Sequence, residues 1–371
     1  MKVALVYDRV NKWGGAERVL LALHELFPDA PLYTSVYDPK KASWAEIFDV
    51  KTSFLQEIPL ASTHHELLAP LMPLAFESFS FDEYDLVISI TSESAKGIVT
   101  KPGTTHLCYC LTPTRYLWSG YDQYFNNDGL KFVSKPIVSA LRKWDITASR
   151  RPDAFVAISK EVQGRIRKYY GRESELVYPP VTIRNSKYEI RNPKQIRNTK
   201  YEIPDTGYFL VVSRLSKFTK YKRVDLAIDA CNQLKLPLKI IGSGSLRRKL
   251  KERAGPTIEF VGSTSDSELV EYYKNSKALI FPGLEDLGLV MIEAQSFGKP
   301  VIAYKAGGAV ELVVDGKTGV FFNEQTSKSL IGALQKFEKM KFDPNLCMEN
   351  AEKFGMDKFK KKFLSVVNKL I

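Results

Sequence analysis

Short apolar runs alternate with stretches of helical periodicity along most of this chain. Strand candidates in the first half are residues 3–7, 86–90, 106–110 and 155–158, and clear helices are residues 17–26 and 160–170. In the second half, strands at 209–213, 238–241, 258–261, 279–281 and 301–303 alternate with helices at 223–233, 245–254 and 266–275. Such alternation is typical of parallel sheets with helices on both faces. The pattern predicts an α/β fold with two Rossmann-like halves.

The segment 281–322 carries the most informative pattern in the chain. A buried strand ends there at Pro-Gly, and an apolar helix follows, with Glu285 and Glu293 placed eight residues apart around the turn between them. Unpaired backbone N–H groups and the positive end of the helix dipole meet at such a turn, which suits an anionic or hydroxyl-rich ligand. A second strand-to-helix turn follows at 306–309 and contains Gly-Gly. Two such turns in succession outline a ligand-binding edge.

Other motifs recur after predicted strands. Gly14 and Gly15 open the first helix in the run Gly-Gly-Ala-Glu-Arg-Val. The run Val-Val-Ser213-Arg214-Leu ends a strand, and Lys222 follows in Tyr-Lys-Arg-Val-Asp-Leu-Ala-Ile. Two further strands end at glycine, in Ile-Ile-Gly242-Ser-Gly and Phe-Val-Gly262. Any one of these motifs is weak, but their order and spacing together are specific.

In this order and spacing, the motifs resemble the retaining nucleotide-sugar glycosyltransferases of glycosyltransferase family 4, over nearly the whole chain. The resemblance implies the GT-B fold, in which two Rossmann-like domains face each other across a cleft and a C-terminal helix crosses back. We therefore expect an acceptor-side domain at 1–181, an inserted linker at 182–206, a donor domain at 207–350 and a crossing helix at 351–371.

The resemblance also implies roles for the residues around the donor phosphates. The leaving diphosphate gains negative charge as the glycosidic bond breaks, and fixed cations lower that barrier. Arg214 is expected to grip phosphate oxygens in a fork, and Lys222 to supply a point charge. The glycine turns and neighbouring backbone complete the donor side, which comprises Gly14, Gly15, Ser213, Gly242, Gly262, Leu287, Gly288 and Leu289. The first glycine turn is open to either the diphosphate or the acceptor.

For the two carboxylates, the resemblance implies contact with the sugar nucleotide. Glu293 is expected to accept hydrogen bonds from ribose hydroxyls. Glu285 is expected either to bind the donor sugar's hydroxyls or to stabilise positive charge at the anomeric carbon. The structural alternative for Glu285 is that it only complements the helix dipole, an effect of about 0.3 to 1 kcal/mol.

Retention of configuration is expected to proceed through the leaving phosphate, because no well-placed side-chain nucleophile is apparent. No Asp-x-Asp ends a strand, so we expect neither a metal nor a cofactor. The runs Gly-Gly-Ala-Glu-Arg-Val-Leu and Thr-Pro-Thr-Arg-Tyr-Leu-Trp are most similar to mannosyltransferase-type members, which makes GDP-mannose the first donor to test. The expected acceptor is a hydroxyl of a glycan or a lipid-linked sugar in polysaccharide, O-antigen or glycolipid synthesis.

One position departs from the family pattern. Related enzymes commonly have a His before Thr-Pro, and this chain has Leu111 there. A polar contact is therefore absent or supplied from elsewhere, unless the subfamily does not use the His. His106 is no obvious substitute, because it shares a strand face with the cysteines two and four residues on. Arg115 and Tyr116 are either acceptor contacts or packing residues.

The net charge of +12 raises the question of anionic partners. An imperfect repeat at 182–204 carries six Lys or Arg against two Glu and is interpreted as an exposed polar insertion. Basic residues and aromatics at 131–144, including Lys131, Lys135, Arg142 and Lys143, predict either a helix on an anionic membrane surface or an ordinary solvated face. No nucleic-acid-binding signature accompanies the charge.

Cellular location follows from weaker signals. The N-terminus lacks the pattern of a signal peptide, and no apolar run has the roughly 18 to 20 residues that span a bilayer. The four cysteines lack paired Cys-x-x-Cys spacing, which favours reduced thiols. We therefore expect a cytoplasmic protein, with peripheral attachment to the inner face of the membrane if the basic helix binds lipid.

Two other classes of function stay open at this point. One is a non-transferase enzyme of the same architecture, such as a nucleotide-sugar epimerase or a glycogen-type phosphorylase. The other is a catalytically silent scaffold that binds a sugar nucleotide or a membrane.

Overall fold

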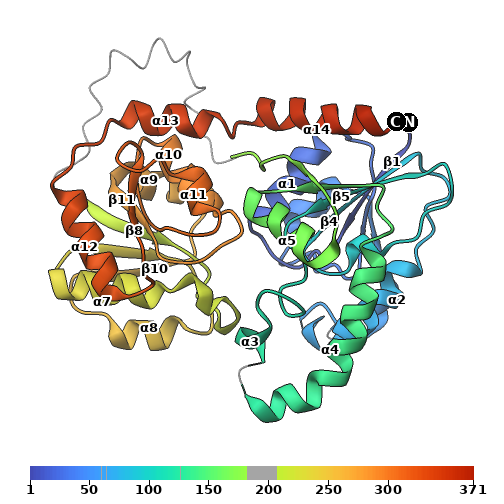
Figure 1. The fold of residues 1–371 in the computed structure, drawn as a ribbon, viewed down its shortest axis with the longest axis horizontal. Coiled ribbons are helices and arrows are strands. Elements are labelled where there is room, and N and C mark those ends of the chain that lie inside the picture. The colour runs from blue at the N-terminus through green and yellow to red at the C-terminus, as the bar shows by residue number, and fades with distance from the viewer. Residues whose placement is uncertain (60, 64, 126, 182–206) are drawn as a thin grey trace. The chain divides into compact units, whose positions relative to one another are not determined.

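The computed structural model describes residues 1–59, 61–63, 65–125, 127–181 and 207–371, so the predicted insertion at 182–206 lies outside the described residues. The chain forms two compact units (Figure 1). The first comprises residues 1–180 and 357–371, and the second comprises residues 181–356. None of the helices in the described ranges combines the length and the apolar composition that crossing a bilayer requires.

The first unit is built on a fully parallel sheet of seven strands. In spatial order they are β3 (Val50–Thr52), β2 (Leu32–Thr34), β1 (Val3–Tyr7), β4 (Leu86–Thr91), β5 (Thr105–Cys110), β6 (Ala154–Ala157) and β7 (Glu175–Leu176). The sequence pattern located β1, β4, β5 and β6. It missed β2, β3 and β7, because runs of two or three residues are too short to show alternation.

Helices cover both faces of this first sheet. The helical elements of this unit are α1 (Gly15–His24), α2 (Met72–Glu77), α3 (Tyr121–Tyr124), α4 (Asp128–Ala148), α5 (Lys160–Tyr170) and the C-terminal α14 (Met356–Leu370), with the short 3-10 helices η1 (Ser43–Ile47), η2 (Phe54–Glu57), η3 (His65–Leu71) and η4 (Ala95–Gly97). On one face, Phe359 and Phe363 of α14 pack against Tyr109 of β5, with ring centroids 6.2 and 6.0 Å apart. The last helix of the chain therefore completes the core of the first unit (Figure 1).

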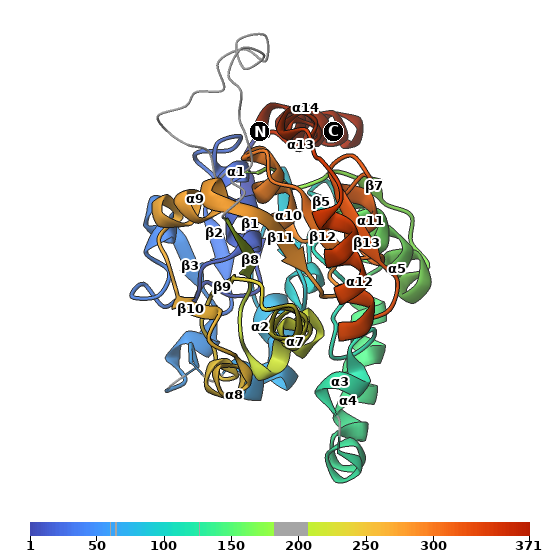
Figure 2. The same ribbon diagram turned by 90° about the vertical axis from the view of Figure 1, so that its left-hand side faces the viewer.

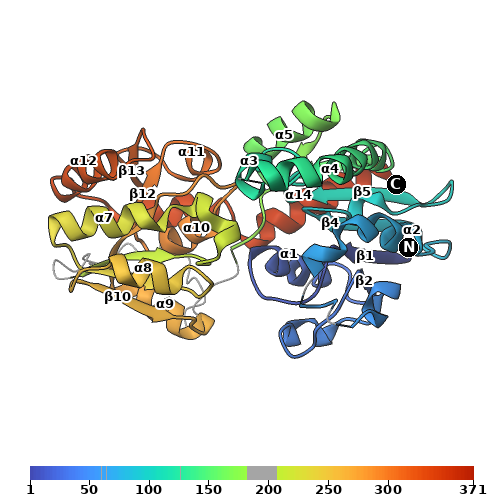
Figure 3. The ribbon, with the colours of Figure 1, turned by 90° about the horizontal axis from the view of Figure 1, so that it is seen from below.

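The second unit contains a fully parallel sheet of six strands. Their order runs across Figure 2 as β10 (Ile258–Gly262), β9 (Leu238–Ile241), β8 (Tyr208–Val212), β11 (Ser276–Phe281), β12 (Val301–Tyr304) and β13 (Gly319–Phe322). The helical elements are η5 (Lys217–Lys222), α7 (Val224–Leu234), α8 (Arg247–Arg253), α9 (Asp266–Asn275), α10 (Leu289–Ser296), α11 (Ala309–Leu312), α12 (Ser327–Glu338) and α13 (Pro344–Glu352). Helices α7 and α12 lie side by side over one face of the sheet (Figure 3).

Each sheet has one point where the direction of strand addition reverses. From β1 the chain adds β2 and then β3 on one side, and it returns to place β4 on the other side of β1. In the second sheet β8, β9 and β10 are followed by β11 on the far side of β8. The loops that leave two such strands diverge at the carboxyl edge of the sheet, where open α/β sheets bind their ligands. The predicted pair of Rossmann-like halves is confirmed.

Replacing Gly242 by Ala should strongly destabilise the second unit. Gly242 has a φ of 135°, and a Cβ there would overlap the carbonyl group of Ser213. We expect a loss of about 3 kcal/mol of unfolding free energy, from strain and overpacking together, measured by chemical denaturation. Gly164→Ala is the matched control, because a Cβ there meets no atom within 4 Å and the site is inside helix α5. That variant should gain about 0.5 to 1 kcal/mol, and equal effects at both sites would contradict the argument.

Candidate functional site

The reversal point of the second sheet holds a small recess. It is lined by the carboxyl ends of β8 and β11 and by the loops that follow them, and Ser213, Lys222 and Glu285 are all part of its wall. Nζ of Lys222 lies 2.5 Å from Oε1 of Glu285, and the two side chains are 13% and 19% exposed. The structure thus brings together three of the predicted donor-site residues. A cation and a carboxylate stand side by side where the topology favours a ligand.

A close backbone approach puts Lys222 in this wall. A Cβ on Gly283 would lie 2.8 Å from Cα of Lys222, so only glycine lets the two loops meet. The backbone N–H of Leu284 donates to the carbonyl of Tyr221 at 3.2 Å. Arg223, the residue after Lys222, has a left-handed φ of 48°, a conformation that costs a non-glycine residue about 1 kcal/mol or more. The lysine turn is therefore held in place at some cost in backbone strain.

The second Gly-Gly turn holds Glu285 from the opposite side. The N–H of Gly308 donates to the carbonyl oxygen of Glu285 at 3.0 Å. Gly307 has a φ of 59°, and a Cβ on it would overlap that same carbonyl oxygen. The turn predicted from sequence as part of a ligand edge thus fixes the backbone of Glu285. These two glycines therefore help to set the position of Glu285 through backbone contacts.

The remaining loop residues of the donor side take up different positions. The N–H of Gly242 donates to the carbonyl of Gly262 at 2.7 Å, which joins the ends of β9 and β10. Gly262 has a φ of 97°, and a Cβ on it would meet no atom within 4 Å. Arg214 directly follows Ser213, but its side chain is exposed and it is not part of the recess wall. The predicted pair of phosphate-binding cations is therefore only half assembled around the recess.

Glu293 lies one turn inside helix α10 and is only 5% exposed. Its Oε2 accepts a hydrogen bond of 2.8 Å from the hydroxyl of Tyr273. The ring of Tyr273 stacks on that of Phe297, with ring centroids 5.7 Å apart. Gly288, with a φ of 90°, is the N-cap of this helix, Leu289 is its first residue, and Leu287 before them is buried. The carboxylate has a partner inside the protein, and its contact with ribose stays a prediction.

In the first unit, Gly14 and Gly15 begin helix α1 as predicted. The carboxylate of Glu17 is buried beside this turn, and a Cβ on Gly14 would lie 3.1 Å from its Oε2. The hydroxyl of Tyr7 donates to Oε1 of Glu17 at 2.7 Å. Burial and this neighbouring charge raise the pKa of Tyr7 well above its ordinary value. A carboxylate at the helix N-terminus makes the turn less suited to a phosphate than to a neutral hydroxyl.

The predicted acceptor residues follow β5 in the first unit. Burial, and after it the nearby carboxylate of Glu93, raises the pKa of Tyr116 well above its ordinary value. The carbonyl of Arg115 accepts a hydrogen bond of 2.8 Å from Gly120, which closes a turn. Leu111 donates its N–H to Thr91 at 2.8 Å and continues the sheet edge. Tyr116 packs with the inner face of α4, so a packing role for it is established, while acceptor contact stays a prediction.

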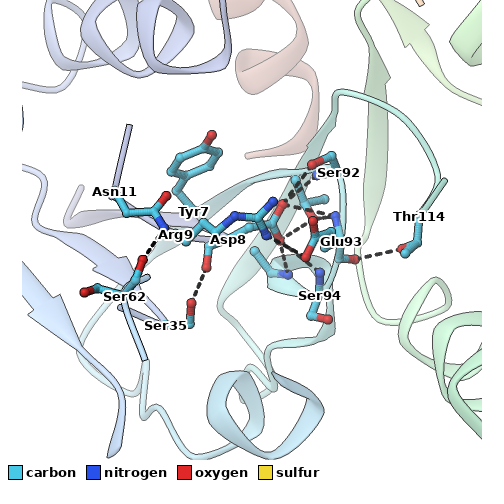
Figure 4. Close-up of polar contacts among 12 residues, drawn as sticks. Tyr7, Asp8, Arg9, Asn11, Ser35, Ser62, Ser92, Glu93, Ser94 and Thr114 are labelled. Atoms are coloured by element: carbon cyan, nitrogen blue, oxygen red, sulfur yellow. Dashed lines mark hydrogen bonds and ion pairs between the residues drawn. The ribbon is translucent and has the colours of Figure 1, made fainter. Parts of the chain in front are cut away.

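Sequence reasoning missed the charged residues at the reversal point of the first sheet. Asp8 and Arg9 directly follow β1, and Glu93 follows β4 (Figure 4). A pair of charged residues at the end of a fully apolar strand was the available signal.

Metal-ligating clusters give no alternative candidate: in the described ranges, no group of three or more His, Cys, Asp or Glu could hold a metal ion. The four cysteines are free and buried, and burial raises the pKa of Cys108 to about 12.

Comparison with known proteins agrees with this geometry. Residues 194–354 match the family model of the glycosyl transferases, group 1. An uncharacterized glycosyltransferase of Methanocaldococcus jannaschii is 31% identical over 118 residues, which cover 30% of this chain and 34% of the relative. The O-antigen chain mannosyltransferase C of Escherichia coli is 24% identical over 175 residues, which cover 45% and 46%. The chain thus aligns with a third to a half of these relatives.

Solved glycosyltransferase structures share the fold of the entire chain. The lipopolysaccharide outer core galactosyltransferase WaaB superposes with a TM-score of 0.66 at 20% identity, covering 100% of both chains. HepE of Anabaena, in complex with UDP and glucose, superposes with a TM-score of 0.68 at 18% identity, covering 99% of both chains. At these identities the likeness establishes the fold. The predicted GT-B glycosyltransferase fold is confirmed, whereas membership of family 4, retention and GDP-mannose stay predictions.

The stability of the folded chain should fall in acid because of His106. The ring is fully buried in β5, its Nε2 lies 2.8 Å from Oγ of Ser89, and burial and then Arg151 lower its pKa from 6.5 to about 3. The unfolded chain binds a proton near pH 6.5, whereas the folded chain does not until about pH 3. The contribution of His106 to the free energy of unfolding is therefore fully present above pH 6.5 and is lost as the pH falls toward 3.

Between pH 7 and pH 5, wild type should lose about 2 kcal/mol that His106→Gln does not lose. The measurement is chemical denaturation of both proteins at the two pH values. Comparing the change within each protein removes the general destabilisation that the substitution itself causes. The same pH dependence in wild type and variant would contradict the expectation.

Proposed function

We propose that this chain is a glycosyltransferase that moves a sugar from a nucleoside diphosphate sugar to a hydroxyl acceptor in polysaccharide or lipopolysaccharide synthesis. The observation that carries the proposal is the Lys222–Glu285 pair at the reversal point of the second sheet, inside the region that matches the group 1 glycosyl transferases. The cation can meet the leaving phosphate while the carboxylate meets the sugar attached to it. Both charges are held by backbone contacts, which is the arrangement that electrostatic catalysis needs.

Two features support the second unit as the donor side. Its sheet edge carries Lys222 in the recess and the exposed residue Arg214 earlier in the same segment after β8, and a guanidinium can bind the oxygens of a diphosphate. By contrast, the first helix turn of the other unit has the buried carboxylate of Glu17 beside it. Metal-independent transfer with retention is the mechanism that these residues favour, because cations on the protein can take the place of a metal at the diphosphate.

The sugar and the base are part of the same proposal. Mannose from GDP-mannose is favoured by the likeness to an O-antigen chain mannosyltransferase. UDP-glucose is the second donor to test, because the structurally similar HepE has been solved with UDP-glucose. The donor panel therefore needs both bases. For the acceptor, a glycan or lipid-linked sugar fits the names of the relatives that act on O-antigen and lipopolysaccharide.

Nucleoside diphosphate release tests the donor side directly. Wild type should release it from one donor of a panel of GDP- and UDP-sugars. Lys222→Ala and Glu285→Gln should each lower the rate at least a hundredfold, because each removes a charge that is preorganised for the transition state. Glu338→Gln is the matched control, because it breaks a Lys–Glu pair of the same unit, Lys277 with Glu338 at 3.2 Å, away from the recess. This variant should retain the wild-type rate.

The alternatives predict other results in the same assay. Thermal stabilisation by one donor without release, over a broad set of acceptors, would support a silent scaffold. Formation of the free epimer without any acceptor would support an epimerase. Normal release from the Lys222→Ala and Glu285→Gln proteins would remove the basis for placing the donor at this recess.

An anionic membrane surface is the second partner that we propose. The N-terminal half of α4 extends away from the sheet of its unit (Figures 1 and 2) and exposes Phe132 and Val133 by 81% and 71%. The opposite side of the helix is buried through Val138 and Leu141. Along the helix, the exposed residue Lys135 lies between Val133 and Val138. Apolar side chains with a basic neighbour match the requirements of a helix that lies in the interface of an anionic bilayer.

Vesicle co-sedimentation tests this surface. Wild type should bind vesicles of phosphatidylcholine mixed with phosphatidylglycerol more strongly than phosphatidylcholine alone, and added salt should weaken the binding. The double variant Phe132→Ser/Val133→Ser should lose most of the binding. Val310→Ser is the control, because Val310 is 50% exposed in the other unit. Self-association that the double variant abolishes, without vesicle binding, would assign the surface to a second copy of the chain instead.

A further inference from the structure

A second charged pair lies at the reversal point of the first sheet. Arg9 is two residues beyond the end of β1, and Glu93 is two residues beyond the end of β4. Nη1 of Arg9 lies 2.7 Å from Oε2 of Glu93, with the side chains 14% and 19% exposed. Lys222 and Glu285 occupy the corresponding loops of the second sheet, after β8 and β11, at similar exposure. Each unit thus has one basic residue and one Glu at the edge where ligands bind.

The loop that carries Glu93 is fixed by the buried carboxylate of Asp8, which is 4% exposed. Its Oδ2 accepts the N–H groups of Ser92 and Glu93 at 2.7 and 3.0 Å, and its Oδ1 accepts those of Ser94 and Ala95 at 2.9 Å each (Figure 4). Burial raises the pKa of Asp8, and these donors oppose the shift. Four backbone donors on one carboxylate restrain the loop strongly, because hydrogen bonds to a charged acceptor are stronger than those between neutral groups.

The backbone of Glu93 is also held from behind. Its carbonyl accepts a hydrogen bond from Oγ1 of Thr114 at 3.3 Å and another from Nζ of Lys96. Lys96 in turn pairs with Asp145 at 2.5 Å, and both side chains are 1% exposed. Such a buried pair is costly to break, because either charge alone would be left without a partner. Thr114 belongs to the same segment as the predicted acceptor residue Tyr116.

This degree of support is more than a surface ion pair needs. Arg9 keeps its Nε buried without a hydrogen-bond partner among the described residues. An unsatisfied donor costs about 1 to 3 kcal/mol, which indicates that the arrangement is not optimised for stability alone. Rigid placement of a partly exposed polar pair by surrounding hydrogen bonds is instead what a binding site requires.

The chemistry of the pair selects a hydroxyl-bearing, uncharged ligand. A guanidinium donates hydrogen bonds and a carboxylate accepts them, so together they can hold two neighbouring hydroxyl groups. A phosphate would be repelled by Glu93, and the Gly14 turn of the same unit has the carboxylate of Glu17 beside it. A sugar ring offers neighbouring hydroxyls without charge.

We propose that Arg9 and Glu93 bind two adjacent hydroxyls of an uncharged sugar in the first unit, with Asp8 and Lys96 as positioning residues. The identification of this sugar as the acceptor rests on the proposed transferase function. The hydroxyl that receives the donor sugar is then oriented by a pair that the chain holds rigid before any ligand arrives.

Saturation-transfer NMR with methyl α-D-mannopyranoside and methyl α-D-glucopyranoside tests the proposal on the full-length protein. Wild type should transfer saturation to at least one of these glycosides. Glu93→Gln and Arg9→Lys should weaken its affinity at least tenfold while donor release without acceptor stays within about twofold of wild type. The two variants differ in the charge they retain, so the proposal stays testable if one of them fails to fold, as judged by circular dichroism.

Two further proteins make the result specific. Glu77→Gln alters another Arg–Glu pair of the same unit, Arg151 with Glu77 at 2.6 Å, and should leave glycoside affinity unchanged. Glu285→Gln should abolish donor release but retain glycoside binding. The proposal would be overturned if the Glu93 and Arg9 variants bound the glycoside with wild-type affinity. It would also be overturned if wild type released nucleoside diphosphate from its donor but transferred no saturation to either glycoside. If the glycoside binds and needs Arg9 and Glu93, but wild type releases no nucleoside diphosphate from any donor, only the transferase function would be overturned.

Discussion

Close contact between neighbouring loop backbones at the carboxyl edge of the second sheet is the constraint on which the proposed donor site depends. Gly242 meets the carbonyl of Ser213, Gly283 meets Cα of Lys222, and Gly307 meets the carbonyl of Glu285. No other residue type fits at these distances, because a Cβ would overlap backbone atoms that cannot move away cheaply. The charged side chains thus stand on loops whose positions are set by one another.

The two units use the same topology with different electrostatics. In the second unit, a lysine lines the recess at the reversal point, and an arginine lies earlier in the same segment after β8. In the first unit, the carboxylates of Asp8, Glu17 and Glu93 cluster around the corresponding edge, and only Glu93 is more than a tenth exposed. One edge is therefore suited to an anionic group and the other to neutral hydroxyls, which are the two reactants of sugar transfer.

Much of the fold was predictable because long apolar strands and amphipathic helices leave strong local patterns. The ranges predicted for β9, α5 and α9 agree with the observed bounds at both ends. Among the strands that the pattern missed, β2, β3 and β7 have only two or three residues each, too few to show a pattern of their own. For the site, the resemblance picked out Glu285 and Lys222, which the structure places in contact. It did not pick out Arg9 or Glu93, because their motif is short and their partners are distant in sequence.

The sequence by itself determined the α/β class, the two Rossmann-like halves and the glycine-bearing turns, since all three are local or periodic features of the chain. Tertiary structure alone decided which side chains meet. Lys222 and Glu285 are separated by 63 residues, and Lys96 and Asp145 by 49, so no local rule could pair them. It also decided that Glu293 faces Tyr273 and that Arg214 is outside the recess wall. Long-range contacts follow from how strands are ordered in a sheet, and that order is fixed only when the whole core packs.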